Sequence, residues 1–178
     1  MRKLTAYIAM SLDGKIAGPN DDLAWLDAVP NPEKSDYGYE DFYKSVDTTI
    51  MGGASWRLID QMDVPFPYGR TKNYVLTRDT QLKDTDDVTF VSGNVSVFLK
   101  ELKEAEGGDI WLIGGGQVNG LCLNLGLIDE LRIFVMPVIL GEGAPLFAGN
   151  VHSQALRLIR STTHSSGVCE LRYRINDT

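Results

Sequence analysis

Short apolar runs, rich in β-branched and aromatic residues, recur along the chain with turn residues between them. The first run covers residues 4–10 and ends in the turn Ser11-Leu12-Asp13-Gly14. Apolar runs of about four to eight residues between glycine, proline or aspartate residues are typical of buried strands. The pattern predicts strands at 4–10, 48–51, 73–77, 88–91, 110–113 and 131–138, and a C-terminal hairpin of strands at 156–162 and 169–175.

Segments with helical patterns alternate with the predicted strands. Strands that alternate with helices favour a parallel sheet with helices on both faces, and the hairpin adds an antiparallel edge. We therefore expect one domain over residues 1–178, with a three-layer αβα fold and a mostly parallel mixed sheet. The helices are expected at 22–26, 40–45 and 94–106, in the segment containing Trp56, Leu58 and Ile59, and after Gly116 as far as Leu125.

The composition favours one sizeable core and argues against several kinds of partner. Of the 178 residues 43% are hydrophobic, and 17 Lys and Arg against 24 Asp and Glu give a net charge of -7. This charge repels nucleic acid. No apolar run approaches the roughly 20 residues that cross a membrane. Cys122 and Cys169 lack the spacing of a metal site or a disulfide framework, so we expect no metal and a cytoplasmic protein.

Two glycine turns each join a predicted strand to a predicted helix. Glycines 114–116 follow the strand at 110–113, and glycines 52–53 follow the strand at 48–51. Glycines let a backbone approach a phosphate closely, and the N–H groups at a helix start attract anions. Neither turn matches GxGxxG or GxxxxGK[ST], so a purely structural turn is the alternative for each. Ser55 either contributes a phosphate-binding hydroxyl or caps its helix. Two such turns suit a dinucleotide.

Segments along nearly the whole chain resemble, in order and spacing, those of dihydrofolate-reductase-like proteins. Among these proteins, the chain looks most similar to the reductase domain of riboflavin biosynthesis. The segments that carry the resemblance are SLDGKIAG at 11–18, TIMGGASW at 49–56, NYVLTRD at 73–79, IWLIGGGQVN at 110–119 and IDELRIFVMPVILGEGAPLF at 128–147.

The resemblance implies an oxidoreductase similar to 5-amino-6-(5-phosphoribosylamino)uracil reductase. Such an enzyme transfers a hydride directly from NADPH to a pyrimidine or pterin-like substrate. We therefore expect NADPH as the cofactor, with NADH as the alternative, and a small heterocyclic molecule as the substrate. One other hypothesis is a non-catalytic nucleotide-binding protein on the same fold. Another is a dihydrofolate reductase, which is disfavoured because Asp36, Glu40 and Asp41 give no clean match to the carboxylate of its pterin site.

The resemblance also implies which residues surround the cofactor. Ala9, Ile16 and Ala17 would lie on the nicotinamide side, Gly52, Gly53 and Ser55 would hold the adenosine-side phosphates, Thr77 and Arg78 would flank the adenosine, and Ile113, Gly114, Gly115, Gly116, Gln117, Val118 and Asn119 would surround the pyrophosphate.

Gly53 departs from the pattern of the family. Related proteins commonly carry a basic residue directly after Met-Gly, where it can clamp a cofactor phosphate, and this chain has Gly53 followed by Ala54. A guanidinium pairs well with phosphate, so Arg57 or Arg78 could supply the missing cation.

Three polar residues are candidates for chemistry on the substrate. Asp13 and Lys15 follow the first strand, beside the expected nicotinamide site, and are interpreted as catalytic. Glu142 lies in a loop that borders the substrate in the riboflavin reductases and is interpreted as substrate-binding. The alternatives are a turn residue for Asp13, because Asp-Gly is a favoured turn pair, and solvated side chains for Lys15 and Glu142.

Two further expectations concern packing and assembly. Trp56 and Trp111 fall on core-facing patterns, whereas Trp25 fits either the core or a surface that stacks on a flat ring. The resemblance also implies pairing through an edge of the sheet, and the apolar strand at 132–138 could contribute to a homodimer.

Overall fold

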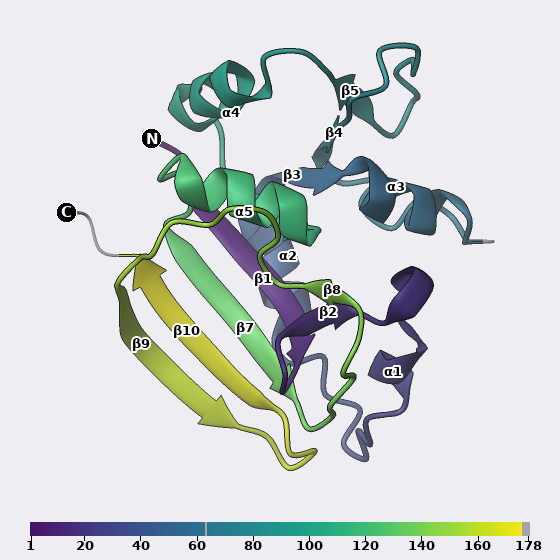
Figure 1. Cartoon of the computed structure of the whole chain (residues 1–178), viewed down its shortest axis with the longest axis vertical. Coiled ribbons are helices and arrows are strands. Elements are labelled where there is room, and N and C mark those ends of the chain that lie inside the picture. The colour runs from purple at the N-terminus through teal and green to yellow at the C-terminus, as the bar shows by residue number, and fades with distance from the viewer. Residues whose placement is uncertain (63, 176–178) are drawn as a thin grey trace.

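The computed structural model describes residues 1–62 and 64–175, and within them an eight-stranded sheet forms the centre of the molecule (Figure 1). The strands follow the spatial order β5-β4-β3-β6-β1-β7-β10-β9. Their bounds are β1 Leu4–Ser11, β3 Val46–Gly52, β4 Lys72–Leu76, β5 Thr89–Val91, β6 Asp109–Gly114, β7 Glu130–Met136, β9 Leu156–Thr163 and β10 Cys169–Ile175.

Pairing is parallel from β5 through β7 and antiparallel between β7, β10 and β9. Crossovers connect the parallel strands, and they contain helices except between β4 and β5. The hairpin turns at His164, whose N–H donates to the Val168 carbonyl over 2.9 Å. The predicted fold class, a mostly parallel sheet with an antiparallel C-terminal hairpin, is confirmed. The helices are η1 Pro19–Asp21, α1 Ala24–Asp27, α2 Tyr39–Ser45, α3 Gly53–Asp60, α4 Val95–Glu104 and α5 Gly116–Asn124.

Alternate residues of β1 face the two layers of helices. Leu4 and Ile8 are buried in the cluster that contains Leu99 of α4. Tyr7, on the other face of β1, stacks on Phe42 of α2 with ring centroids 4.4 Å apart. Accordingly, α5 lies in front of the sheet and α2 behind it in Figure 1. Complete burial of one leucine or isoleucine side chain contributes about 1.5–3 kcal/mol, so both layers hold the sheet in place.

The tryptophans pack as core residues. Trp111 is 5% exposed and Trp25 is 7% exposed. The Trp56 ring packs edge-on against Phe90, with centroids 4.8 Å apart. The expectation for Trp56 and Trp111 is confirmed, and the core alternative holds for Trp25, which packs in a cluster with Phe134.

A small sheet of β2 Lys15–Ala17 and β8 Ala144–Pro145 was not expected from the sequence. Its strands are too short for a periodic pattern, and they pair only because the chain returns after β7. The return is close, since a Cβ on Gly143 would lie 2.1 Å from the Ala17 carbonyl oxygen. The segment after β7 is thereby held against the loop after β1.

Strand β7 lies inside the sheet, because it pairs with β1 on one side and β10 on the other. The apolar character of residues 132–138 therefore reflects burial within the chain. A dimer through a sheet edge would have to use another strand, and the homodimer itself stays a prediction. No helix within residues 1–62 and 64–175 has the length and the apolar character needed to cross a membrane.

Candidate functional site

A cleft of about 1050 Å³ opens at the carboxyl ends of the central parallel strands. Ala9 of β1, Gly52 at the end of β3, Leu76 at the end of β4 and Ile113 of β6 all line it. Ligands of open α/β sheets bind at this edge, because the loops that follow parallel strands meet there. The cleft is therefore the candidate site.

The first glycine turn leads from β6 into α5. Gly114 has a φ of +104°, which disfavours any side chain. A Cβ on Gly116 would lie 2.4 Å from the Pro145 carbonyl oxygen, so a side chain has no room there either. No side chain caps the start of α5. Its first N–H groups are therefore available to an anion.

The second glycine turn leads from β3 into α3 and lies beside the first. A Cβ on Gly52 would approach Val118 of α5 to 3.0 Å, so the turns are close packed. The Gly115 N–H donates to the Ser55 hydroxyl oxygen over 3.1 Å. Ser55 thus connects the turns, and no side chain caps the start of α3. The structure brings together the two turns that the sequence singled out.

Two arginines lie at the end of the cleft that the two glycine turns form. Arg57 reaches back along α3, so that its Nη1 atom lies 3.5 Å from the Cβ position of Gly53. Arg78 donates to the Gln117 side-chain oxygen over 3.3 Å. Both side chains are exposed and line the cleft. Arg57 thereby brings a cation beside the position where related proteins carry a basic residue.

Most of the residues expected around a cofactor line the cleft, although their role toward a cofactor stays a prediction. Gly114 and Asn119 lie outside the lining. The buried Asn119 amide donates to the Leu146 carbonyl over 2.8 Å and packs under Gly114. Asn119 therefore supports the turn from behind. The expected residues that do line the cleft are Ala9, Ile16, Ala17, Gly52, Gly53, Ser55, Thr77, Arg78, Ile113, Gly115, Gly116, Gln117 and Val118.

Asp13 joins two loops. Its carboxylate accepts a hydrogen bond from the Ser11 hydroxyl at 2.7 Å and from the backbone N–H groups of Leu140 and Gly141 at 3.0 and 2.8 Å. These bonds, led by that from Ser11, lower the pKa of Asp13 to about 2. The carboxylate holds the segment after β7 against the turn after β1.

Lys15 and Glu142 also lie outside the residues that line the cleft. Lys15 pairs with Pro145 in the small sheet, and Glu142 is exposed. The structure thus gathers the expected cofactor residues but does not bring the three expected chemical residues into the lining.

The other end of the cleft is apolar and aromatic, and the sequence did not single out its residues. The Tyr7 hydroxyl donates to the Tyr37 carbonyl at 3.3 Å, and the Tyr68 ring packs against Trp111 with centroids 5.1 Å apart. Burial raises the pKa of both tyrosines well above the ordinary value, so both are protonated at neutral pH. The alternation of β1 could have identified Tyr7. Tyr68 lies in an irregular segment without such a signal.

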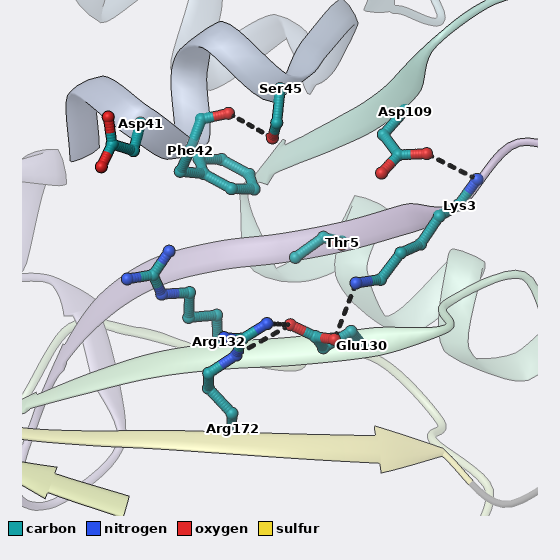
Figure 2. A pocket seen from close by; sticks show the side chains of 9 residues that line it. All are labelled: Lys3, Thr5, Asp41, Phe42, Ser45, Asp109, Glu130, Arg132 and Arg172. Carbon is teal, nitrogen blue, oxygen red and sulfur yellow. Dashed lines mark hydrogen bonds and ion pairs between the residues drawn. The ribbon is translucent and has the colours of Figure 1, made fainter. Parts of the chain in front are cut away.

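A second cavity, of about 230 Å³, lies at the amino ends of the parallel strands, opposite the cleft (Figure 2). Its charges neutralise one another. The buried Glu130 carboxylate contacts Lys3 at 2.7 Å and Arg172 at 2.6 Å, while the Arg132 Nε atom lies 2.5 Å from Glu170. The network joins β1, β7 and β10, which indicates a structural role. In residues 1–62 and 64–175 no group of three metal-ligating side chains comes together.

Comparisons with known proteins agree with this geometry. The profile of the RibD C-terminal domain matches residues 2–170. The uncharacterized protein YwjB of Bacillus subtilis (strain 168) is 36% identical over 172 residues, which cover 97% of each chain. A putative riboflavin biosynthesis protein from Shewanella sp. PV-4 is 30% identical, covers 99% of this chain and 100% of its own, and superposes with a TM-score of 0.85.

Dihydrofolate reductase from Enterococcus faecalis, solved in complex with NADP(H), shares the fold. It superposes with a TM-score of 0.70 at 15% identity and covers 98% of this chain and 97% of its own. The expected dihydrofolate-reductase-like fold is confirmed. With the profile matching nearly its whole length, this chain belongs to the RibD C-terminal domain family.

Proposed function

We propose that this chain is an NADPH-dependent reductase that transfers a hydride to a substrate with a flat heterocyclic ring, of the pyrimidine or pterin kind. The observation that carries the proposal is a single cleft with two different ends. One end has two adjoining glycine turns and two arginines, and the other end is apolar and aromatic. This division suits a dinucleotide bound beside an organic ring. Membership of a reductase-domain family supports an oxidoreductase activity.

The glycine end suits the phosphates of a dinucleotide. Side chains are excluded at Gly116 by the Pro145 carbonyl, so the backbone itself faces the cleft. The uncapped starts of α3 and α5 would direct N–H groups at the pyrophosphate. Arg57 and Arg78 would bind the additional phosphate that distinguishes NADPH from NADH. NADPH supplies the hydride when it is bound.

The residues of the chain would hold the cofactor and the substrate in position and exclude water from between them. Ala9, Ile16 and Ala17 would pack against the nicotinamide, and Ile113 lines the same cleft. Holding two reactants in contact removes a large part of the entropic barrier of a hydride transfer. The protonated hydroxyls of Tyr7 and Tyr68 would border the ring that accepts the hydride. Neither ionises at neutral pH, which suits an uncharged environment.

Deuterium transfer tests the reductase activity directly. The purified chain would be mixed with NADPH deuterated at C4 and with pyrimidine, pterin and other heterocyclic acceptors in turn, and the products would be analysed by mass spectrometry. We expect one acceptor to gain a single deuterium on carbon as NADPH is consumed. Tight NADPH binding without transfer to any acceptor would instead favour a non-catalytic nucleotide-binding protein.

A further inference from the structure

Among the described residues that line the cleft, the cationic side chains are Arg57 and Arg78, and both belong to the glycine end. The Arg57 guanidinium lies beside Gly53, and Arg78 is bonded to Gln117 at the start of α5. The cationic side chains of the cleft are therefore placed where dinucleotide phosphates would bind, and the Asp79 carboxylate follows Arg78 in the lining.

The ring end has a different chemistry. Its lining comes from β1, from the segment around η1 and α1, and from the last turn of α3 with the segment that follows it. Asp21 of η1 brings a carboxylate to this part of the cleft, and its side chain is exposed. The principal residues are Tyr7, Leu23, Leu26, Ile59, Met62 and Tyr68.

Two arginines from neighbouring elements lie outside the lining and are already engaged. Arg132 bonds to Glu170 at 2.5 Å and lies over the Tyr7 ring, 4.9 Å from its centroid. Arg70 donates to the Tyr43 carbonyl and lies 4.6 Å from the centroid of that ring. Neither guanidinium is therefore a free partner for an anion, and Lys15, which precedes the lining residues Ile16 and Ala17, stands outside the lining.

A phosphate group at the ring end would carry up to two negative charges into an apolar surface next to a carboxylate. Removing an ion from water is costly unless a counter-charge or several hydrogen bonds replace its hydration. An uncharged flat ring has no such cost and gains contact with the aromatic and aliphatic side chains. The distribution of charge in the cleft therefore favours an uncharged flat ring over a phosphorylated substrate.

We infer, on the basis of the reductase function proposed above, that the substrate is an uncharged planar ring without a phosphate group. This class differs from the phosphorylated pyrimidine named in 5-amino-6-(5-phosphoribosylamino)uracil reductase. In the reaction a C=N or C=O bond of the substrate, in the ring or in a substituent that the ring carries, accepts a hydride on carbon and a proton from solvent on nitrogen or oxygen. NADPH is oxidised to NADP⁺ in the same step.

A matched pair of substrates tests the inference. The pair is 5-amino-6-(5-phosphoribosylamino)uracil and the same compound without its phosphate, with lumazine as a ring that carries no sugar. Binding to the complex of the protein with NADP⁺ would be followed by thermal shift, and turnover by NADPH absorbance. We expect the uncharged compounds to be favoured by about tenfold or more, the factor expected for one unpaired charge.

Each adverse result has a distinct meaning. If the phosphorylated compound is bound and reduced as well as its partner, or if no neutral ring binds, the inference is overturned. The proposed reductase still stands in the first case, because NADPH is consumed. Absence of NADPH binding in a prior fluorescence titration would overturn the proposed function instead. Loss of activity toward the phosphorylated compound in Arg70→Ala would identify Arg70 as a cation that the inference excludes.

Introducing a cation at the ring end gives a test by gain of function. Met62 is 46% exposed and lines the cleft, so Met62→Arg changes the charge with little effect on folding. Relative to the uncharged control Met62→Gln, we expect Met62→Arg to bind the phosphorylated compound about fivefold more tightly relative to the same compound without its phosphate. Equal binding of that compound by the two variants would contradict the placement of the substrate.

Discussion

At the scale of single residues, the pairing of Gly53 with Arg57 explains how the chain can lack a basic residue after Met-Gly. A glycine at this position leaves space, and the guanidinium from one turn further along α3 lies 3.5 Å from where its Cβ would stand. The cation is thus displaced along the chain but retained in the cleft. This arrangement follows from the helix, because residues four apart share one face.

Arg57→Ala should weaken NADPH binding by about tenfold, because a charge-assisted bond to phosphate is lost. NADH binding should change little, since NADH lacks that phosphate. Arg57→Lys serves as the control that keeps the charge. Fluorescence titrations with both cofactors measure the effect, and an equal loss for NADPH and NADH would show that Arg57 acts on the protein itself.

Asp13 should contribute stability through its bonds to Leu140 and Gly141. Its pKa is about 2 in the folded chain, against an ordinary value of 3.8. The contribution is therefore present above pH of about 4 and is lost as pH falls toward 2. Asp13→Asn should lower the thermal unfolding temperature at pH 7, and the difference from the parent chain should narrow toward pH 2. The exposed neighbour Glu142→Gln is the control and should leave the profile unchanged.

At the scale of elements, the glycine turns are fixed by what packs behind them. The segment from Ala144 to Ala148 lies against the start of α5, where the Ala148 N–H donates to the Gly116 carbonyl over 2.9 Å. A backbone carbonyl has little freedom to move aside. The turn, the small sheet and the segment after β7 therefore behave as one unit.

Gly116→Ala should destabilise the chain by about 1–3 kcal/mol, because its methyl group would overlap the Pro145 carbonyl. Gln117→Ala, at the next and exposed position of α5, should have almost no effect on stability. Chemical denaturation measures both values. A Gly116→Ala variant as stable as its parent would mean that the return segment is free to move.

Glu130 should stabilise the junction of β1, β7 and β10. Burial opposes ionisation of this carboxyl, but bonds from Lys3 and Arg172 outweigh it and hold its pKa below the ordinary value. Glu130→Gln should cost about 2 kcal/mol of unfolding free energy at pH 7, since Lys3 and Arg172 are partly exposed and retain some hydration. The cost should diminish in acid, below the pKa of the unfolded carboxyl. A difference in unfolding free energy between Glu130→Gln and the parent chain that stays the same at every pH would contradict this account.

Most element types could be predicted, because the longer strands have apolar runs and most crossovers a helical pattern, whereas the order of the strands in the sheet comes from the structure. The helix predicted at 94–106 is shorter in the structure. Asn94 caps its start by accepting the Val97 N–H, and the helix ends at Glu104. The small sheet of β2 and β8 could not be predicted, because strands of three and two residues are too short to show a periodic hydrophobic pattern. Asp13 shows why the candidate chemical residues were harder to place: a turn motif indicates its position but not the distant loop that it binds.

At the scale of the whole molecule, the sheet has a charged cluster at one end of its parallel strands and the candidate cleft at the other end. The ion pairs of Figure 2 lie at the amino ends of the parallel strands, and the cleft lies at their carboxyl ends. Neutralised charges at one edge stabilise the sheet, whereas the glycine turns at the other edge leave backbone groups available. The ion-pair network and the candidate binding site thus lie at opposite ends of the same strands.

The homodimer is also a property of the whole molecule and stays a prediction from the family resemblance. Strand β7 has both neighbours within the chain, so dimerisation should leave its pairing unchanged. Sedimentation velocity should give twice the 19.7 kDa of one chain. A species of 19.7 kDa at all concentrations would contradict the expectation.

Titration of the purified chain with NADPH and NADH, followed by nicotinamide fluorescence and thermal shift, tests the central claim most directly. A ligand that binds only the folded state stabilises it by mass action, by about 2.7 kcal/mol at a concentration of 100 times Kd. The two glycine turns and their arginines predict saturable binding, a raised unfolding temperature and preference for NADPH. No fluorescence change and no stabilisation by either cofactor would contradict both the dinucleotide site and the reductase built on it.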